Sequence, residues 1–100
     1  MDVVVRTYTG NGSKELFSLL EQRKAEVEKL MRSVKGFESY TLARSSSGEG
    51  GLSMTVCQDK GGTEESGRVA KEWITKNAGN IGVDSPKVSQ GSIIIHATNN

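Results

Sequence analysis

The chain has 100 residues, with 13 basic and 12 acidic side chains spread along it and a formal net charge of +1. A chain of this length is expected to form one domain, residues 1–100. The balanced charge excludes the basic stripe typical of nucleic-acid binding, and no apolar run approaches the roughly 20 residues of a membrane-spanning helix.

Residues 2–9 are predicted to form a strand. Val3, Val5 and Thr7 alternate with Val4, Arg6 and Tyr8. Apolar side chains therefore lie on both faces, which is typical of a strand covered on both sides.

Residues 13–35 are predicted to form one long helix, with Ser13 as the N-cap and Gly36 ending it. About 22 helical residues would span about 33 Å. A narrow apolar stripe runs along this helix, formed by Leu16, Leu20, Val27, Leu30 and Val34.

Arg23 lies near the centre of that stripe. An unpaired guanidinium buried there would cost several kcal/mol. One interpretation is that the side chain reaches solvent or pairs with a carboxylate. The other is that it faces a cavity and binds an anionic or carbonyl group with two hydrogen bonds.

A hairpin is predicted from residues 37–44 and 52–58, because both runs alternate around a tip of Ser, Gly and one Glu. Tyr40 and Leu42 share one face, and Leu52, Met54 and Val56 share one face of the returning strand. We expect both sets on the side that packs against helices. The opposite side would then carry small, weakly polar residues, namely Ser39, Thr41, Ala43, Ser53, Thr55 and Cys57.

A second helix is predicted from the N-cap Thr63 to Gly79. Gly67 inside it suggests a close approach to a strand, and Trp73 either packs in the core or lines a pocket.

The last strand is predicted from Lys87 onward. Ile93, Ile94 and Ile95 are apolar on both faces and predict a strand covered on both sides. His96 shares a face with Ile94, where a structural role is more common than a catalytic one.

The predicted order is strand, helix, strand, strand, helix, strand. This order indicates an α+β, ferredoxin-like βαββαβ fold: a four-stranded antiparallel sheet with two helices on one face. The apolar patterning of the terminal strands predicts that the bare face meets a second copy, which gives a homodimer.

This order and three segments carry a resemblance to a known family: LFSLLEQRKAEVEKLM, GFESYTL and LSMTVCQDKGGTEES. The chain resembles, over essentially its whole length, the dimeric α+β barrels related to antibiotic biosynthesis monooxygenases. The resemblance implies a homodimer whose two sheets face each other as a barrel, with a cavity between sheet and helices in each subunit.

Members of that superfamily oxidise aromatic polyketides and quinols without a cofactor, degrade haem, or bind small molecules without catalysis. The haem-degrading branch needs a histidine on the second helix, and no His occurs between Thr63 and Gly79. We therefore expect no haem, and no other cofactor or metal.

Three functions follow as alternatives. The first is a dimeric module that binds a small, partly apolar organic molecule without assigned chemistry. The second is a cofactor-independent monooxygenase acting on a phenol or quinol. The third is a non-catalytic assembly or stress-response scaffold.

The candidate ligand-binding residues are Tyr8, Arg23, Tyr40, Cys57 and Trp73, and the catalytic candidates are Arg23, Tyr40 and His96. In the monooxygenase reading Arg23 would stabilise a phenolate, while Tyr40 and Trp73 would position the ring.

Cys57 is the only cysteine, so neither an intrachain disulfide nor a cysteine metal cluster can form. A buried strand thiol usually acts as a small hydrophobe, and becomes a redox candidate only if it is exposed with a lowered pKa. The N-terminus lacks the pattern of a signal peptide. The sequence therefore predicts a reduced, cytoplasmic protein.

Overall fold

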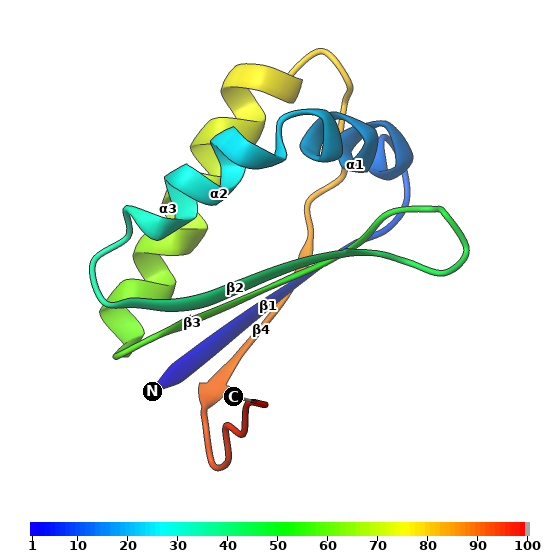
Figure 1. Cartoon of the computed structure of the whole chain (residues 1–100). Helices are drawn as coiled ribbons and strands as arrows, with labels where there is room; N and C mark the ends of the chain where they lie inside the picture. The colour runs from blue at the N-terminus through cyan, green and yellow to red at the C-terminus, as the bar shows by residue number, and fades with distance from the viewer. Residues whose placement is uncertain (100) are drawn as a thin grey trace.

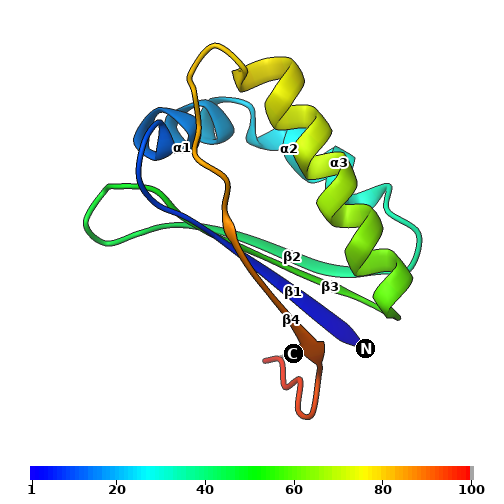
Figure 2. The same ribbon diagram turned by 180° about the vertical axis from the view of Figure 1, so that it is seen from behind.

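The computed structural model describes residues 1–99, and within them a single sheet carries helices on one side (Figure 1). The elements follow in the order β1 (Asp2–Tyr8), α1 (Ser13–Gln22), α2 (Lys24–Arg32), β2 (Phe37–Arg44), β3 (Gly51–Cys57), α3 (Lys60–Ala78) and β4 (Lys87–Ser92). The four strands pair antiparallel in the order β2-β3-β1-β4. The view from behind shows the same arrangement, with the other face of the sheet bare (Figure 2). The predicted α+β, ferredoxin-like class is confirmed.

The prediction of one long first helix is wrong, because the chain breaks at Arg23 into α1 and α2. Arg23 has φ −113° and ψ 29°, outside the helical region. The two helices run in different directions (Figure 1), and both contribute buried apolar residues to the core. The second segment ends at Arg32, and Gly36 follows it with φ +81°. At the start, Gly12 is the N-cap in place of Ser13.

The predicted sides of the hairpin are also wrong for β3. Tyr40 pairs with Thr55, and Thr41 pairs with Met54. Paired residues point to the same side, so Leu52, Met54 and Val56 lie on the side away from the helices while Ser53, Thr55 and Cys57 face the helices. On that side Met54 is 40% exposed, whereas Val56 is buried. Period-two alternation defines two sets of residues, but the pairing of strands decides which set is covered.

The start of α3 lies earlier than predicted. Asp59 is the N-cap, and its carboxylate accepts a hydrogen bond from the Gly62 N–H at 3.1 Å. Gly62 fits against β3, since a Cβ there would lie 2.7 Å from the Cβ of Cys57. Thr63 is therefore inside the helix, and the predicted end at Gly79 is confirmed.

The last strand differs most from its prediction. It lies at the edge of the sheet beside β1 and stops at Ser92, so Ile93–95 and His96 lie beyond it. Ile94 and Ile95 are 95% and 82% exposed. The pairing ends because β1 ends: Asp2 pairs with Ser92, and the N–H of Ile93 makes a final bond to the Met1 carbonyl at 2.8 Å.

The core lies between the sheet and the helices, and its centre is a cluster of buried side chains from all three helices and β1. The cluster comprises Tyr8, Leu16, Phe17, Leu20, Val27, Met31 and Ala78. Burial of such side chains supplies the main favourable free energy of folding. Across residues 1–99, no helix has the length and apolar character needed to cross a membrane.

Candidate functional site

A cavity of about 540 Å³ lies between α3 and the edge of the sheet formed by β1 and β4. Its lining mixes apolar, aromatic and charged side chains. The strands contribute Val4, Arg6, Tyr8, Val88 and Gln90; α3 contributes Thr63, Glu64, Gly67, Lys71, Ile74 and Thr75; and the loop between α3 and β4 contributes Val83, Asp84, Ser85 and Pro86.

Alternation along β1 and one fixed loop explain how two walls of the cavity are formed. Alternation along β1 places Val4, Arg6 and Tyr8 on the helix side, and all three are buried. The loop that closes one wall is held at Asp84, whose carboxylate accepts a hydrogen bond from the Asn11 N–H at 3.0 Å. The N–H of Asp84 in turn donates to the Asn11 carbonyl, also at 3.0 Å. The wall is thereby fixed to the turn before α1.

Arg6 is the polar group that sequence reasoning missed. Its side chain is only 4% exposed, and its Nη2 donates to the Oγ of Ser66 at 2.9 Å. The Ser66 hydroxyl donates to the Thr63 carbonyl at 2.7 Å, which orients it to accept from Arg6. Burial lowers the pKa of the Arg6 guanidinium below its ordinary value.

The approach of Arg6 also explains the glycine inside α3. A Cβ on Gly67 would lie 3.1 Å from Nη2 of Arg6, closer than a side chain normally comes. The predicted close approach of Gly67 to a strand is therefore confirmed, and the strand is β1. The signal for Arg6 was present in the sequence, because a charge shares its strand face with Val4 and Tyr8.

Tyr8 is the one sequence-predicted ligand contact that lines the large cavity. It is 5% exposed and meets Phe17 edge to face, with ring centroids 5.9 Å apart. Burial raises the pKa of the Tyr8 hydroxyl, and the nearby Arg6 charge partly opposes this. The phenol is thus a neutral hydrogen-bond donor near neutral pH.

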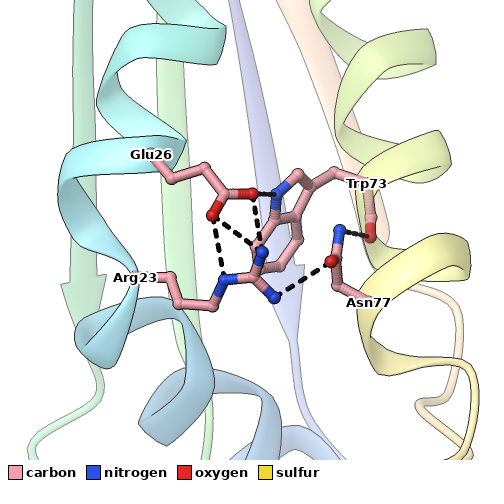
Figure 3. A network of polar contacts seen from close by, with 4 residues as sticks. All are labelled: Arg23, Glu26, Trp73 and Asn77. Atoms are coloured by element: carbon pink, nitrogen blue, oxygen red, sulfur yellow. Dashed lines mark hydrogen bonds and ion pairs between the residues drawn. The ribbon is translucent and has the colours of Figure 1, made fainter.

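Arg23 and Trp73 meet in a different place, where α2 faces α3 (Figure 3). The Arg23 guanidinium donates to both carboxylate oxygens of Glu26, at 2.7 and 2.8 Å from Nη2, and to the Asn77 amide oxygen at 2.9 Å. Trp73 donates from Nε1 to Glu26 at 2.8 Å, and the guanidinium carbon lies 5.1 Å from the indole centroid. Hydrogen bonds from Trp73 and Arg23 lower the pKa of Glu26. The cluster joins the two helices, as in the carboxylate-pairing interpretation of Arg23.

None of the remaining candidates lines the large cavity, but Tyr40 lines a small second cavity of about 30 Å³ together with Tyr8 and Trp73. Tyr40 packs under α2 beside the core, where burial raises the pKa of its hydroxyl to about 12. Cys57 is fully buried, and burial raises the pKa of its thiol, so the redox reading is not favoured. His96 is exposed beyond β4. The roles of Arg23, Tyr40, Cys57, Trp73 and His96 toward a ligand stay predictions.

The donor set of the cavity does not suit haem. None of the residues that line it is His, Cys or Met, the side chains that most often bind haem iron. The one phenol, Tyr8, has a pKa raised by burial, which opposes the phenolate that iron would need. In residues 1–99, no three His, Cys, Asp or Glu side chains are grouped closely enough to hold a metal ion.

The fold and the site together define an α+β, ferredoxin-like domain with a cavity beside α3. No family model and no curated protein sequence matches the chain. Solved structures do match over nearly all of it. A monooxygenase from the gene ActVA-Orf6 of Streptomyces coelicolor, in complex with the ligand nanaomycin D, is 14% identical, with 99% of this chain and 91% of that one covered and a TM-score of 0.66.

Two further structures show how varied the proteins with this fold are. NE2512, a protein of unknown function from Nitrosomonas europaea, is 13% identical, with 99% and 93% of the two chains covered and a TM-score of 0.71. The haem degrader MhuD of Mycobacterium tuberculosis, with two haems bound, is 15% identical, with 98% and 100% covered and a TM-score of 0.67. The resemblance noted in the sequence is therefore confirmed at the level of the fold.

Proposed function

We propose that the protein binds a small, partly apolar organic molecule in the cavity between α3 and the β1–β4 edge. The observation that carries this proposal is the cavity itself: about 540 Å³, with apolar walls and a buried guanidinium and phenol beside them. That volume lies within the roughly 300–1,000 Å³ of known small-molecule pockets, which typically combine apolar walls with a few fixed polar groups. Unfilled space of this size also disfavours a purely structural scaffold.

The binding unit in this proposal is a homodimer of the whole chain, residues 1–100, in the cytoplasm. Support comes from the bare face of the sheet, where Val3, Val5 and Leu52 are half-buried and Met54 is 40% exposed. An apolar face of this kind is covered at least cost by the same face of a second copy.

Native mass spectrometry of protein freshly purified from its own host tests both parts at once. We expect twice the mass of the chain plus a small organic mass. Met54→Lys should give the monomer, because it places a charge at the centre of the bare face. Ser46→Lys, at the exposed hairpin tip, adds the same charge elsewhere and should leave the dimer intact. A monomeric parent protein would remove the dimer from the proposal.

Binding in this cavity can be tested separately with the fluorescent apolar probe 1-anilinonaphthalene-8-sulfonate. Val88→Trp should block the cavity from β4, whereas Ser46→Trp should leave probe binding unchanged. Equal binding by both variants would place the probe elsewhere and contradict the proposal.

A second candidate function is cofactor-independent oxygenation of a phenol or quinol in the same cavity. It is supported by the fold shared with the ActVA-Orf6 monooxygenase and by Arg6, whose buried charge can stabilise a phenolate. Arg23, the residue first assigned this role, is held by Glu26. Oxygen uptake with a panel of anthrones and quinols, absent in Arg6→Met, is the expected result. No uptake with any of them would refute this candidate for those substrates.

A further inference from the structure

The arginines of this chain divide into two groups. Four of them have exposed side chains, and each has a carboxylate partner: Arg23 with Glu26, Arg32 with Glu28, Arg44 with Glu21, and Arg68 with Glu65 and Glu72. Arg6 is the buried one, and no carboxylate in residues 1–99 lies within 4.0 Å of it. The arginine that loses most solvation thus lacks a neutralising partner.

The groups around Arg6 do not supply the missing charge. Its hydrogen-bond partner Ser66 is neutral, and it occupies one of the five N–H donors of a guanidinium. The nearby Tyr8 is held in its neutral form by a raised pKa. A buried charge persists where paired groups compensate its lost hydration. A negatively charged ligand in the open space beside Arg6 can compensate the lost hydration of its guanidinium.

The rim of the cavity leaves that space available to an anion. Two carboxylates lie there, and both have partners: Asp84 accepts from the Asn11 N–H, and Glu64 lies 3.9 Å from the Lys60 ammonium. Lys71 lies on the same rim and adds a positive charge. The charged groups that line the cavity are equal in number, Arg6 and Lys71 against Glu64 and Asp84, but only Arg6 is buried and the other three are exposed. Water and salt screen exposed charges most strongly, so the least screened charge is that of Arg6, which favours a negative ligand.

We propose that the ligand of this cavity is an organic anion, whose charged oxygen group binds Arg6 and the Tyr8 hydroxyl while its apolar body packs against Val4, Ile74 and Val88. The inference rests on the proposed binding function and adds the charge of the ligand. A carboxylate and an ionised phenol share this chemistry, and a guanidinium pairs with either through charge-assisted hydrogen bonds.

Isothermal titration with three matched naphthalene probes tests the inference. 2-Naphthoate carries a carboxylate, 2,4-dinitro-1-naphtholate carries an ionised phenol, and 2-naphthalenemethanol is neutral. At least one anion should bind about tenfold or more tightly than the alcohol, the ratio expected for a charge-assisted hydrogen bond. The anion that shows the preference identifies the oxygen group.

Variants then assign the preference to Arg6. Arg6→Met should abolish it, Arg6→Lys should keep part of it, and Arg68→Met, which removes an exposed charge, should not change it. Unliganded Arg6→Met should unfold at the same or a higher temperature than the parent, because an uncompensated buried charge is gone.

Each contrary result has a distinct meaning. If the neutral alcohol binds as tightly as the anions, or if Arg6→Met keeps the preference, the anion assignment is overturned while the binding function stands. If Arg6→Met no longer folds, the charge serves the fold and the assignment is again overturned. If none of the three probes binds, the proposed function fails as well.

Discussion

Two glycines in the hairpin loop allow backbone strain to be separated from close packing. Gly48 and Gly50 both have φ of +83°, a conformation that residues with a Cβ rarely adopt. A Cβ on Gly48 would have no atom within 4 Å, whereas a Cβ on Gly50 would lie 2.2 Å from the Tyr8 carbonyl oxygen. That carbonyl belongs to β1, which is held by strands on both sides. It cannot move away without disturbing the sheet and the cavity wall.

The expected costs follow from this geometry. Gly48→Ala should lower the free energy of unfolding by about 1–2 kcal/mol, the cost of the left-handed conformation for alanine. Gly50→Ala incurs the same cost and adds an overpacking cost of typically 1–3 kcal/mol, because Tyr8 and the loop must separate. At about 4–8 °C per kcal/mol for a domain of this size, its Tm should be lower than that of Gly48→Ala by about 4–24 °C.

Thermal unfolding followed by circular dichroism measures this difference, with both variants at the same chain concentration so that any association affects them equally. The 2-naphthoate affinity of Gly50→Ala should also fall, since Tyr8 lines the cavity. Equal Tm values for the two variants would show that the loop does not press on β1, and would refute the packing argument.

Three further predictions concern single side chains. The folded-state pKa of Tyr40 is raised to about 12, so the stability this gives is complete below pH 10 and is lost as pH rises toward 12. The parent should therefore lose about 2–3 kcal/mol more than Tyr40→Phe over that interval in pH-dependent denaturation, and equal losses would contradict the assignment. The pKa of Glu26 is depressed, so the emission of Trp73, the only tryptophan, should change only as pH falls below the ordinary carboxyl value of 4.5. Glu26→Gln should lack this transition, and its persistence there would exclude Glu26 as the source. Thr55 is fully buried, and its hydroxyl has no hydrogen-bond partner in residues 1–99. Thr55→Val should thus raise the free energy of unfolding by about 1 kcal/mol or more, and a lower midpoint in urea would indicate a partner for that hydroxyl.

The features that depend on local chemistry could be predicted from the sequence. Alternation and the Ser/Gly tip predict the hairpin, the alternating and helical patterns predict the order of elements, and Gly79 marks the end of α3. Gly67 inside the helical pattern indicates a close approach to a strand from the sequence alone. These signals lie within a few residues of the structure they specify.

The features that depend on pairing between distant segments could not be predicted. In β3, both sets of alternating residues are compatible with burial, and only the register with β1 and β2 places Thr55 inside and Met54 outside. β4 stops where its partner β1 stops, a limit that the apolar run of Ile93–95 does not contain. Arg23, at the break between α1 and α2, donates a hydrogen bond to Asn77 of α3, a contact between distant residues that the helical pattern does not contain.

The site illustrates the same division. Arg6 and Arg23 both interrupt apolar patterns, and by sequence alone Arg23 is the more conspicuous because it lies near the centre of the apolar stripe predicted for residues 13–35. In the folded protein Arg23 lies at a helix surface and forms an ion pair with Glu26. Arg6 lies in a central strand under α3 and is the arginine that faces the cavity. The resemblance to a family implies a cavity between sheet and helices, but which residues line it depends on the fold.

The position of the cavity follows from how the helices cover the sheet. α2 packs on β2 and α3 packs on β1 and β3, so the edge strand β4 is left to the loop that Asp84 fixes. The space above β4 is therefore a consequence of the topology, and Arg6 faces it because β1 is the neighbouring strand. Val88 and Gln90, on the exposed edge strand, line this space without belonging to the core cluster. Substitutions at these two positions can change the shape of the ligand that is accepted at little cost to the fold, whereas Arg6 sets its charge.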